Sequence, residues 1–176
     1  MIEVFVSRLG LDSSNNSYVV ILQERGGTRL LPIWIGQPEA ESIVMHMHNV
    51  KRPRPITHDL IRSLIMGMDA QLRRVQITRV EKQTYYAELH LQHGDTLARI
   101  DARPSDGIAI AIRLDAPIYA AEQLLVEPGE DTAEEESDEP DYGGGDAPTS
   151  EGDLTIEQLK AYLEKLRPED FGKFNP

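Results

Sequence analysis

The sequence changes character at Pro104, and this change constrains the fold more than any other feature of the chain. Proline has no backbone N–H and cannot donate to a β-ladder, so a strand that includes residues 97–100 must end before it. Ser105 is a favourable helix N-cap, and Asp106 follows where the positive end of a helix dipole favours a carboxylate. We therefore predict a strand that ends before Pro104 and a helix that starts there.

The residues that follow Pro104 are compatible with two secondary structures. Ile108, Ile110 and Ile112 alternate with small residues, a pattern that also fits a strand. The Pro-Ser-Asp start signal and the helix propensity of the intervening alanines favour a helix instead. Arg113 supports this choice, because a cation is favoured near the C-terminal end of a helix.

Three charged side chains gather at the strand-to-helix turn if this helix forms. Asp101 and Arg103 lie where the strand ends, and Asp106 lies in the first turn of the helix. Turns of this kind are a common place for ligand-binding groups. The same residues also fit a structural role, in which an Asp–Arg pair fixes the turn. The spacing alone leaves both interpretations open.

The predicted strands and helices occur twice in the same order. A set of three strands and one helix comes first, and a second set follows at an offset of 66 residues, the separation of Pro38 and Pro104. A further helix joins the sets, and a short strand follows the second. We predict an α+β fold in which duplicated β-β-β-α half-domains form one compact domain over residues 1–127. The predicted strands are 2–9, 18–22, 29–35, 72–80, 85–91, 96–100 and a short one within 118–126, and the helices are 38–47, 57–68 and the one after Pro104.

The negative charge of the chain is concentrated in its C-terminal part. Residues 1–127 contain 14 Lys and Arg against 15 Asp and Glu, whereas residues 128–176 contain 4 against 15. Proteins that bind nucleic acid tightly and without sequence preference generally carry an excess of basic residues. The nearly neutral first part argues against that class. Two local basic clusters are present there, namely Lys51, Arg52 and Arg54, and the pair Arg73 and Arg74.

The C-terminal part itself divides in two. Between Gly129 and Asp153 there are eleven acidic residues and no basic one, which predicts an acidic flexible linker over residues 128–153. A capping-box sequence begins at Thr155, and apolar residues follow it at helical spacing. We predict a C-terminal helix and tail over residues 154–176, and we expect this helix to dock onto the domain or onto a neighbouring subunit.

The composition also bounds the chemistry and the location of the chain. No cysteine is present, which excludes disulfides, thiolate metal sites and cysteine nucleophiles. The sequence contains no long apolar run and does not begin with a basic segment followed by an apolar one. We therefore expect no membrane span, no signal peptide and a cytoplasmic location.

Three separated motifs resemble the bifunctional nuclease (BFN-domain) family. They are Leu31–Gly36, Arg54–Leu60 and Ile100–Ile112, and they occur in the family's order within residues 1–127. The resemblance implies a compact α/β domain that forms homo-oligomers. It also implies nuclease activity that hydrolyses phosphodiester bonds of DNA and RNA, with nucleic acid as the substrate.

The resemblance points to a set of site residues near the ends of the predicted elements. A nuclease must stabilise the charge of a phosphate and activate a nucleophile. We expect catalytic roles for Asp101, Asp106, His58 and Asp59, and substrate binding by Arg103 and Arg54.

Divalent-metal assistance is a further expectation, because metal-assisted nucleases hold Mg²⁺ or Mn²⁺ with clustered carboxylates. Asp101, Asp106 and Glu41 are the candidate ligands. His58 fits general acid–base catalysis or metal binding, and it also fits a polar residue on a solvated helix start. These two interpretations of His58 stay open.

A non-enzymatic function is the second hypothesis. The chain contains no phosphate-binding loop, nucleophile elbow or zinc-protease motif. An oligomeric binding or regulatory module would agree with the nearly neutral domain and with the docking helix. His90 and His93 flank a predicted turn, so we expect them at the surface. Trp34 we expect in the core or in a subunit contact rather than as a platform for stacked bases.

Overall fold

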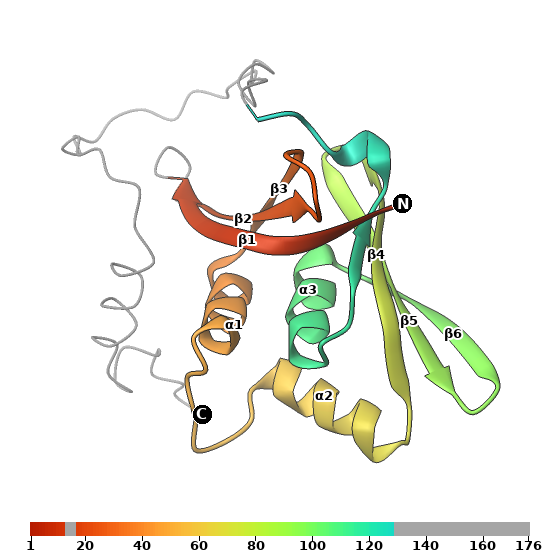
Figure 1. The fold of residues 1–176 in the computed structure, drawn as a ribbon. Helices are drawn as coiled ribbons and strands as arrows, with labels where there is room; N and C mark the ends of the chain where they lie inside the picture. The colour runs from red at the N-terminus through yellow and green to blue at the C-terminus, as the bar shows by residue number, and fades with distance from the viewer. Residues whose placement is uncertain (13–16, 129–176) are drawn as a thin grey trace.

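The computed structural model describes residues 1–12 and 17–128 (Figure 1). The predicted C-terminal helix and all but the first residue of the predicted linker lie outside these residues, so both stay predictions. Within the described ranges the chain forms seven strands, three α-helices and one 3-10 helix. In chain order they are β1 (Ile2–Asp12), β2 (Ser17–Glu24), β3 (Leu30–Ile35), α1 (Gln37–Met47), α2 (Thr57–Gly67), β4 (Gln71–Glu81), β5 (Thr84–His93), β6 (Thr96–Ala102), α3 (Pro104–Arg113), β7 (Ile118–Ala120) and η1 (Glu122–Leu124).

All seven described strands join one sheet in the order β3-β2-β1-β7-β4-β5-β6. Neighbouring strands are antiparallel except β4 and β7, which are parallel. The short strand β7 therefore lies between the two predicted sets of three strands. The α+β prediction is confirmed, and the duplication of the half-domains stays a prediction.

The sheet bends around the helices. Figure 1 shows β1, β2 and β3 crossing above the helices, while β4, β5 and β6 run down beside them. Helix α3 lies in the centre of this arrangement and packs against α1, α2, β4 and β5. The central position of α3 places its N-terminal turn where the two helices and the edge strands come together.

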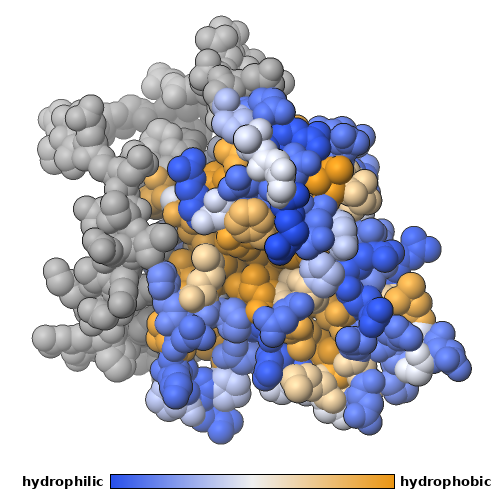
Figure 2. Space-filling model, viewed as in Figure 1, coloured by the Kyte–Doolittle hydropathy of each residue, from blue (hydrophilic) through white to orange (hydrophobic). Residues whose placement is uncertain are grey.

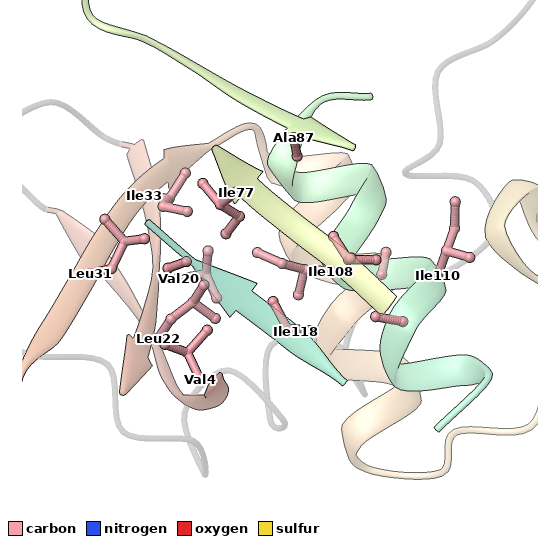
Figure 3. Packing of buried hydrophobic residues seen from close by; sticks show 14 of the residues in the cluster. Val4, Val20, Leu22, Leu31, Ile33, Ile77, Ala87, Ile108, Ile110 and Ile118 are labelled. Atoms are coloured by element: carbon pink, nitrogen blue, oxygen red, sulfur yellow. The ribbon is translucent and has the colours of Figure 1, made fainter. Parts of the chain in front are cut away.

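The middle of helix α3 is apolar on every side because α1, α2 and the sheet enclose it. Ile108, Ala109 and Ala111 are fully buried, and Ile110 is nearly so. Figure 3 shows Ile108 among the side chains of the sheet, near Ile77 and Ile118. A fully enclosed helix has no polar stripe, so its large and small apolar residues can alternate as they would in a strand. This explains the ambiguous pattern, and the prediction of a helix is confirmed.

Gly107 allows α3 to approach the sheet closely. A β-carbon at this position would lie 2.9 Å from Cγ1 of Val75, which is itself fully buried on β4. Interiors at native packing density leave no room for such an atom without movement of its neighbours. The glycine in the first turns of α3 therefore serves packing and not backbone flexibility.

The helix starts differ from the predicted caps. Ser105 was expected to be the N-cap of α3, but the N-cap is Arg103, Pro104 takes the first helical position, and the Ser105 side chain is buried. Proline suits that position because the first helical N–H has no intrahelical acceptor. Helix α2 begins at Thr57, and the backbone N–H of Ile56 donates to Asp59 Oδ2 at 3.1 Å. Neither N-cap residue, Arg103 or Ile56, makes a side-chain capping hydrogen bond.

Several large apolar side chains lie at the surface. Trp34 is 47% exposed, so its predicted core position is wrong, and the alternative of a subunit contact stays a prediction. Leu60, Leu64 and Met66 of α2 are more than half exposed, and so is Met68, which follows the helix. Figure 2 shows apolar residues in the middle of one face of the molecule, with hydrophilic residues around them. Contiguous exposed apolar surface of this kind marks an interaction or ligand-binding surface.

The described helices are short relative to a bilayer. Among residues 1–12 and 17–128, no helix combines the length and the apolar composition that a transmembrane crossing requires.

Candidate active site

A cavity of about 890 Å³ opens beside the N-terminal turn of α3. Apolar side chains of α2 and of the edge strands form one part of its wall, among them Ile61, Leu64, Leu89 and Ile100. The polar part of the wall comes from three separate helix starts. Its ionisable and hydroxyl residues include Glu39, Glu41, Ser42, His58, Arg103 and Asp106.

His58 lies in the first turn of α2 and connects two other helices. Its Nδ1 is 2.8 Å from Ser42 Oγ on α1, and its Nε2 is 3.1 Å from Asp106 Oδ1 on α3. The residue is only 8% exposed. The interpretation of His58 as a polar residue on a solvated helix start is therefore wrong. The side chain of His58 faces inward, where Ser42 of α1 and Asp106 of α3 provide its hydrogen-bond partners.

The hydrogen-bond network assigns the tautomer of His58. Arg113 Nη2 donates to Ser42 Oγ at 3.1 Å, and a guanidinium N–H can only donate. The ionised carboxylate of Asp106 can only accept, so the proton of the neutral His58 ring is on Nε2, and Nδ1 accepts the proton of the Ser42 hydroxyl. The Nε2–H group donates to Asp106. Both ring nitrogens are thus engaged, in the sequence Arg113, Ser42, His58, Asp106.

Asp106 accepts hydrogen bonds from two basic side chains. Arg103 Nε lies 2.9 Å from its Oδ2, and His58 Nε2 approaches its Oδ1. Burial opposes ionisation of Asp106, but the hydrogen bonds from Arg103 and His58 outweigh it and hold the pKa of this carboxyl below its usual value. Asp106 is therefore an anion at neutral pH and accepts hydrogen bonds from both side chains.

Arg103 stands at the mouth of the cavity. Its Nη2 is 2.8 Å from Glu39 Oε1, and its side chain is 66% exposed while Glu39 is largely covered. Two carboxylates, Glu39 and Asp106, therefore hold one solvent-facing guanidinium in place. The structural interpretation of the turn, an Asp–Arg pair, is confirmed with Asp106 as the acid. An exposed and positioned guanidinium is also a suitable partner for a phosphate.

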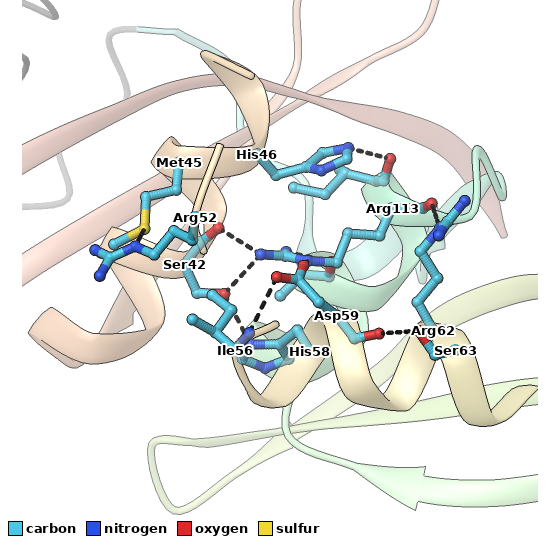
Figure 4. Close-up of polar contacts among 12 residues, drawn as sticks. Ser42, Met45, His46, Arg52, Ile56, His58, Asp59, Arg62, Ser63 and Arg113 are labelled. Atoms are coloured by element: carbon cyan, nitrogen blue, oxygen red, sulfur yellow. Dashed lines mark hydrogen bonds and ion pairs between the residues drawn. The ribbon is translucent and has the colours of Figure 1, made fainter. Parts of the chain in front are cut away.

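Arg113 supports the site from behind (Figure 4). It is almost fully buried, and its Nε donates to Asp59 Oδ1 at 2.7 Å. Its other nitrogens donate to the carbonyl oxygens of Ala109 at 2.8 Å and Ser42 at 3.0 Å. Burial raises the pKa of Asp59. The hydrogen bonds from Arg113 and from the Ile56 N–H outweigh burial, so the pKa lies below its usual value. In this arrangement Asp59 binds the arginine and the start of α2.

The structure brings some predicted site residues together and separates others. His58, Asp106 and Arg103 meet at the cavity, and Asp59 lies behind them. Asp101 is at the rim, but it is in register with Glu88 and its charge acts on Arg79, so its carboxylate faces the other side of the sheet. Arg54 is exposed and does not line the cavity.

Two residues of the network, Ser42 and Arg113, were not predicted as site residues. Ser42 stands beside Ile43 and Val44 within an apolar helix face, and Arg113 ends an otherwise apolar helix. A lone polar residue inside an apolar segment is the signal that marked them, because a buried polar group requires a partner. Only the packing of α1, α2 and α3 shows which groups are the partners of Ser42 and Arg113.

The carboxylates near the cavity do not form a metal site in this arrangement. Among the described residues, no three His, Asp or Glu side chains are grouped so that they could hold a metal ion. Asp106 and Glu39 pair with Arg103, and Glu41 accepts a hydrogen bond from Gln37 at 2.8 Å. The roles derived below are therefore assigned to protein side chains alone.

One predicted surface histidine is buried. His93 is exposed as expected, but His90 is 4% exposed, so its predicted surface position is wrong. His90 lies on β5 between Arg74 of β4 and Arg99 of β6. The long side chains of neighbouring strands cover it, which the spacing to the turn did not reveal.

Comparison with known proteins gives a consistent family match. The sequence model of the bifunctional nuclease domain matches residues 20–132. An uncharacterized protein of Mycobacterium tuberculosis is 39% identical over 169 residues, which cover 96% of this chain and 97% of that protein. That match leaves only seven residues of this chain outside the alignment, so it includes most of residues 128–176.

Plant proteins match over a shorter region. Bifunctional nuclease 2 of Arabidopsis thaliana is 32% identical over 117 residues, which cover 65% of this chain and 36% of that protein. Bifunctional nuclease 1 of Oryza sativa subsp. japonica is 27% identical over 121 residues, which cover 67% of this chain and 37% of that protein. The chain therefore spans little more than a third of the length of these plant relatives.

Proposed function

Because this chain belongs to the bifunctional nuclease domain family, we propose that it is a nuclease that hydrolyses phosphodiester bonds of DNA and RNA. Plant relatives that carry the name bifunctional nuclease support the proposal. The observation that carries it is the pairing of His58 with Asp106 beside Arg103 at the mouth of the large cavity. An acid–base group and a phosphate-binding cation then lie side by side.

His58 and Asp106 act as the acid–base pair in this proposal. An imidazole held by a carboxylate can take a proton from a nucleophile and return it to a leaving group, while the carboxylate stabilises the imidazolium. For His58 to take a proton, Nδ1 must exchange the Ser42 hydroxyl for a water or for the substrate. The serine then turns its proton elsewhere, and Arg113 keeps the hydroxyl oxygen in place.

Arg103 binds the phosphate group. Its Nε and Nη2 face Asp106 and Glu39, which leaves Nη1 on the exposed side of the guanidinium. Contact between a guanidinium and a non-bridging phosphate oxygen stabilises the charge that develops in the transition state. Because the two carboxylates fix the guanidinium before the substrate arrives, little side-chain entropy is lost on binding.

We include in this proposal that Mg²⁺ or Mn²⁺ assists the cleavage, and the assay tests this dependence. The nearby carboxylates already have partners: Asp106 and Glu39 form ion pairs with Arg103, and Glu41 accepts a hydrogen bond from Gln37. A metal requirement would mean that substrate phosphates supply several of the ligands, as they do at many Mg²⁺ sites. The assay therefore includes each cation and a chelator.

The test compares two histidine variants of the full chain on labelled single-stranded DNA and RNA. We expect His58→Gln to lower the cleavage rate by about 10²- to 10⁴-fold, the usual contribution of a general acid–base group. His48→Gln is the matched control, because His48 is exposed at the end of α1 and should leave the rate unchanged. Thermal unfolding of both variants shows whether the fold is retained. Full turnover in folded His58→Gln would remove the proposed acid–base role.

A non-enzymatic oligomeric binding or regulatory module is the second candidate function. It is favoured by the exposed apolar side chains of Leu60 and Leu64 on α2 and of Met68 at its end, together with Leu97 and Ile100 on the edge strand β6. An unpaired edge next to apolar surface suits a contact between subunits or with a partner. Absence of cleavage with either cation, together with a stable homo-oligomer in light scattering, would favour this function over the nuclease.

A further inference from the structure

Three basic side chains stand in one row across the strands at the edge of the sheet. Arg74 of β4 is in register with His90 of β5, and His90 is in register with Arg99 of β6. The row places a positive charge on each side of His90 with no opposite charge in register, and like charges across strands do not stabilise a sheet. The row therefore has no explanation in the stability of the sheet itself.

The middle member of this row, His90, is buried without hydrogen bonds. Among the described residues its Nδ1 has no partner, and its Nε2 lies 3.3 Å from Glu88 Oε2 in a geometry that makes no hydrogen bond. Arg74 Nε is also buried without a partner. Buried polar atoms are nearly always satisfied, and those that are not commonly face a ligand, ion or water. Here two adjacent residues of the row share this condition.

A second cavity, of about 310 Å³, opens at the row. It is large enough for a phosphate group with its water, and its walls offer guanidinium, imidazole and amide donors from Arg73, Arg74, His90 and Gln92. Asp95 also lines it, and Glu88 stands beside His90. Among the residues that line this cavity, Arg73 and Arg74 carry two positive charges and Asp95 carries one negative charge, so the lining is net positive.

The second cavity lies on the face of the sheet opposite to the candidate active site. Leu89 and Leu91 line the large cavity, and His90 stands between them on the same strand. Side chains alternate between the two faces along a strand, so His90 points away from the large cavity.

We propose that Arg74, His90 and Arg99 form a binding site for a phosphate-type oxyanion, supplied either as a free anion or by a polynucleotide backbone. Arginines bind such groups through two parallel N–H donors, and the imidazole adds a third direction. The site is separate from the proposed catalytic residues. Its binding can be measured without any cleavage, so a failure of the nuclease proposal leaves this test intact.

Bound anion and protonated His90 favour one another. The pKa of His90 lies below its usual value because burial and the charges of Arg74 and Arg99 oppose protonation, while Glu88 favours it. An anion on the two arginines offsets their charge and makes protonation easier. Conversely, protonation adds a positive charge to the site, so anion binding strengthens as the pH falls through the pKa of His90. Asp95, which lines the same cavity, repels a bound anion whether His90 is neutral or protonated.

The test follows the ring resonances of His90 in the full chain by NMR between pH 5 and 8, with and without sulfate. Sulfate keeps one charge state over this range, so any change in titration belongs to the protein. We expect sulfate to raise the pKa of His90 by about 0.5 or more, a change within the ordinary reach of one neighbouring charge. The resonances of His48, which is exposed at the end of α1 and lines neither cavity, serve as an internal control and should not respond.

Substitutions assign the response to the row. Arg99→Gln is the main variant, because Arg99 is exposed and its loss should leave the fold intact, and Arg74→Gln is the second. Both should abolish the response to sulfate. Arg8→Gln is the matched control, since it removes the same charge from an exposed position on β1 and should keep the response. Equal responses in all three variants, or none in the parent chain, would overturn the proposal.

A second arm identifies the source of the anion. A short oligothymidylate that shifts His90 as sulfate does, and competes with it, would assign the site to a polynucleotide backbone. A response to sulfate alone would assign it to a free phosphate-type anion. If His90 is insensitive to both but moves in high concentrations of sodium chloride, the acidic residues of 130–153 already occupy the site, and the phosphate assignment is overturned.

Discussion

Two buried histidines lie on opposite faces of the same domain, and their surroundings differ in almost every respect. His58 on α2 contacts side chains of two other helices, and each of its ring nitrogens has a hydrogen-bond partner. His90 lies between two arginines on neighbouring strands, and neither of its ring nitrogens has one among the described residues. The two histidines are almost equally buried, yet both ring nitrogens of His58 have hydrogen-bond partners and those of His90 have none among the described residues.

The difference shows what burial alone does not tell about a polar residue. A satisfied network such as that of His58 holds the elements around it in one geometry, because each broken bond leaves another buried group unpaired. An unsatisfied group such as His90 adds cost to the fold unless a ligand or water completes it. The first arrangement explains how α1, α2 and α3 are held together, and the second points to something outside the chain.

Removal of the arginine behind His58 should have the largest effect on stability. Arg113→Met would leave the carboxylate of Asp59 and the carbonyl of Ser42 without their donor. We expect a loss of about 3 kcal/mol in the free energy of unfolding, as for other ion pairs broken on one side, with Asp59 partly reached by water. Urea unfolding followed by circular dichroism measures this. Arg79→Met is the control, because its pair with Glu81 is exposed and should add nothing measurable.

Replacement of each histidine by leucine tests the comparison directly. His58→Leu should cost about 2 kcal/mol, because Ser42 and Asp106 both lose a buried partner. His90→Leu should be neutral or stabilising at pH 7, because no hydrogen bond is lost and an unsatisfied polar group is removed. Unfolding midpoints in urea at low salt give both values. Equal losses in the two variants would show that His90 makes bonds in solution that resemble those of His58.

The pH dependence of stability should separate the two sites by a smaller amount. The pKa of His90 is lower in the folded chain than its usual value of about 6.5, so the unfolded chain binds a proton first as the pH falls. The free energy of unfolding is therefore not reduced by His90 above about pH 6.5, and it decreases as the pH falls below this value. This decline should be smaller than the loss of stability expected for His58→Leu.

The matched variant for this measurement is His90→Gln, which removes the titrating group and keeps a polar side chain. Its unfolding free energy should vary less than that of the parent between pH 6.5 and 5. Below pH 4 both should lose stability together, since Asp106 and Asp59 have lowered pKa values whose contribution disappears as these carboxyls gain protons. Parallel curves over the whole range would contradict the assignment to His90.

Much of the fold could be predicted from the sequence because it depends on local chemistry. Pro104 ends a strand and starts a helix by its missing N–H, and the apolar periods of the other segments give their type and approximate bounds. The caps were less predictable. Ser105 and Thr57 have the right side chains for an N-cap, yet each helix begins one or two residues away, where the packing of α2 and α3 places the chain.

The site divides along the same line. The sequence by itself determined that His58 and Asp106 occupy the first turns of two helices and that Arg103 precedes one of them, because the start signals of helices are local. Only the tertiary structure decided that these turns meet, that Ser42 and Arg113 complete the network, and that Asp101 faces away with Glu88. Likewise, the register of β4, β5 and β6 alone placed His90 between two arginines. Such contacts join residues far apart in the chain, and their energies depend on packing and register that no local pattern specifies.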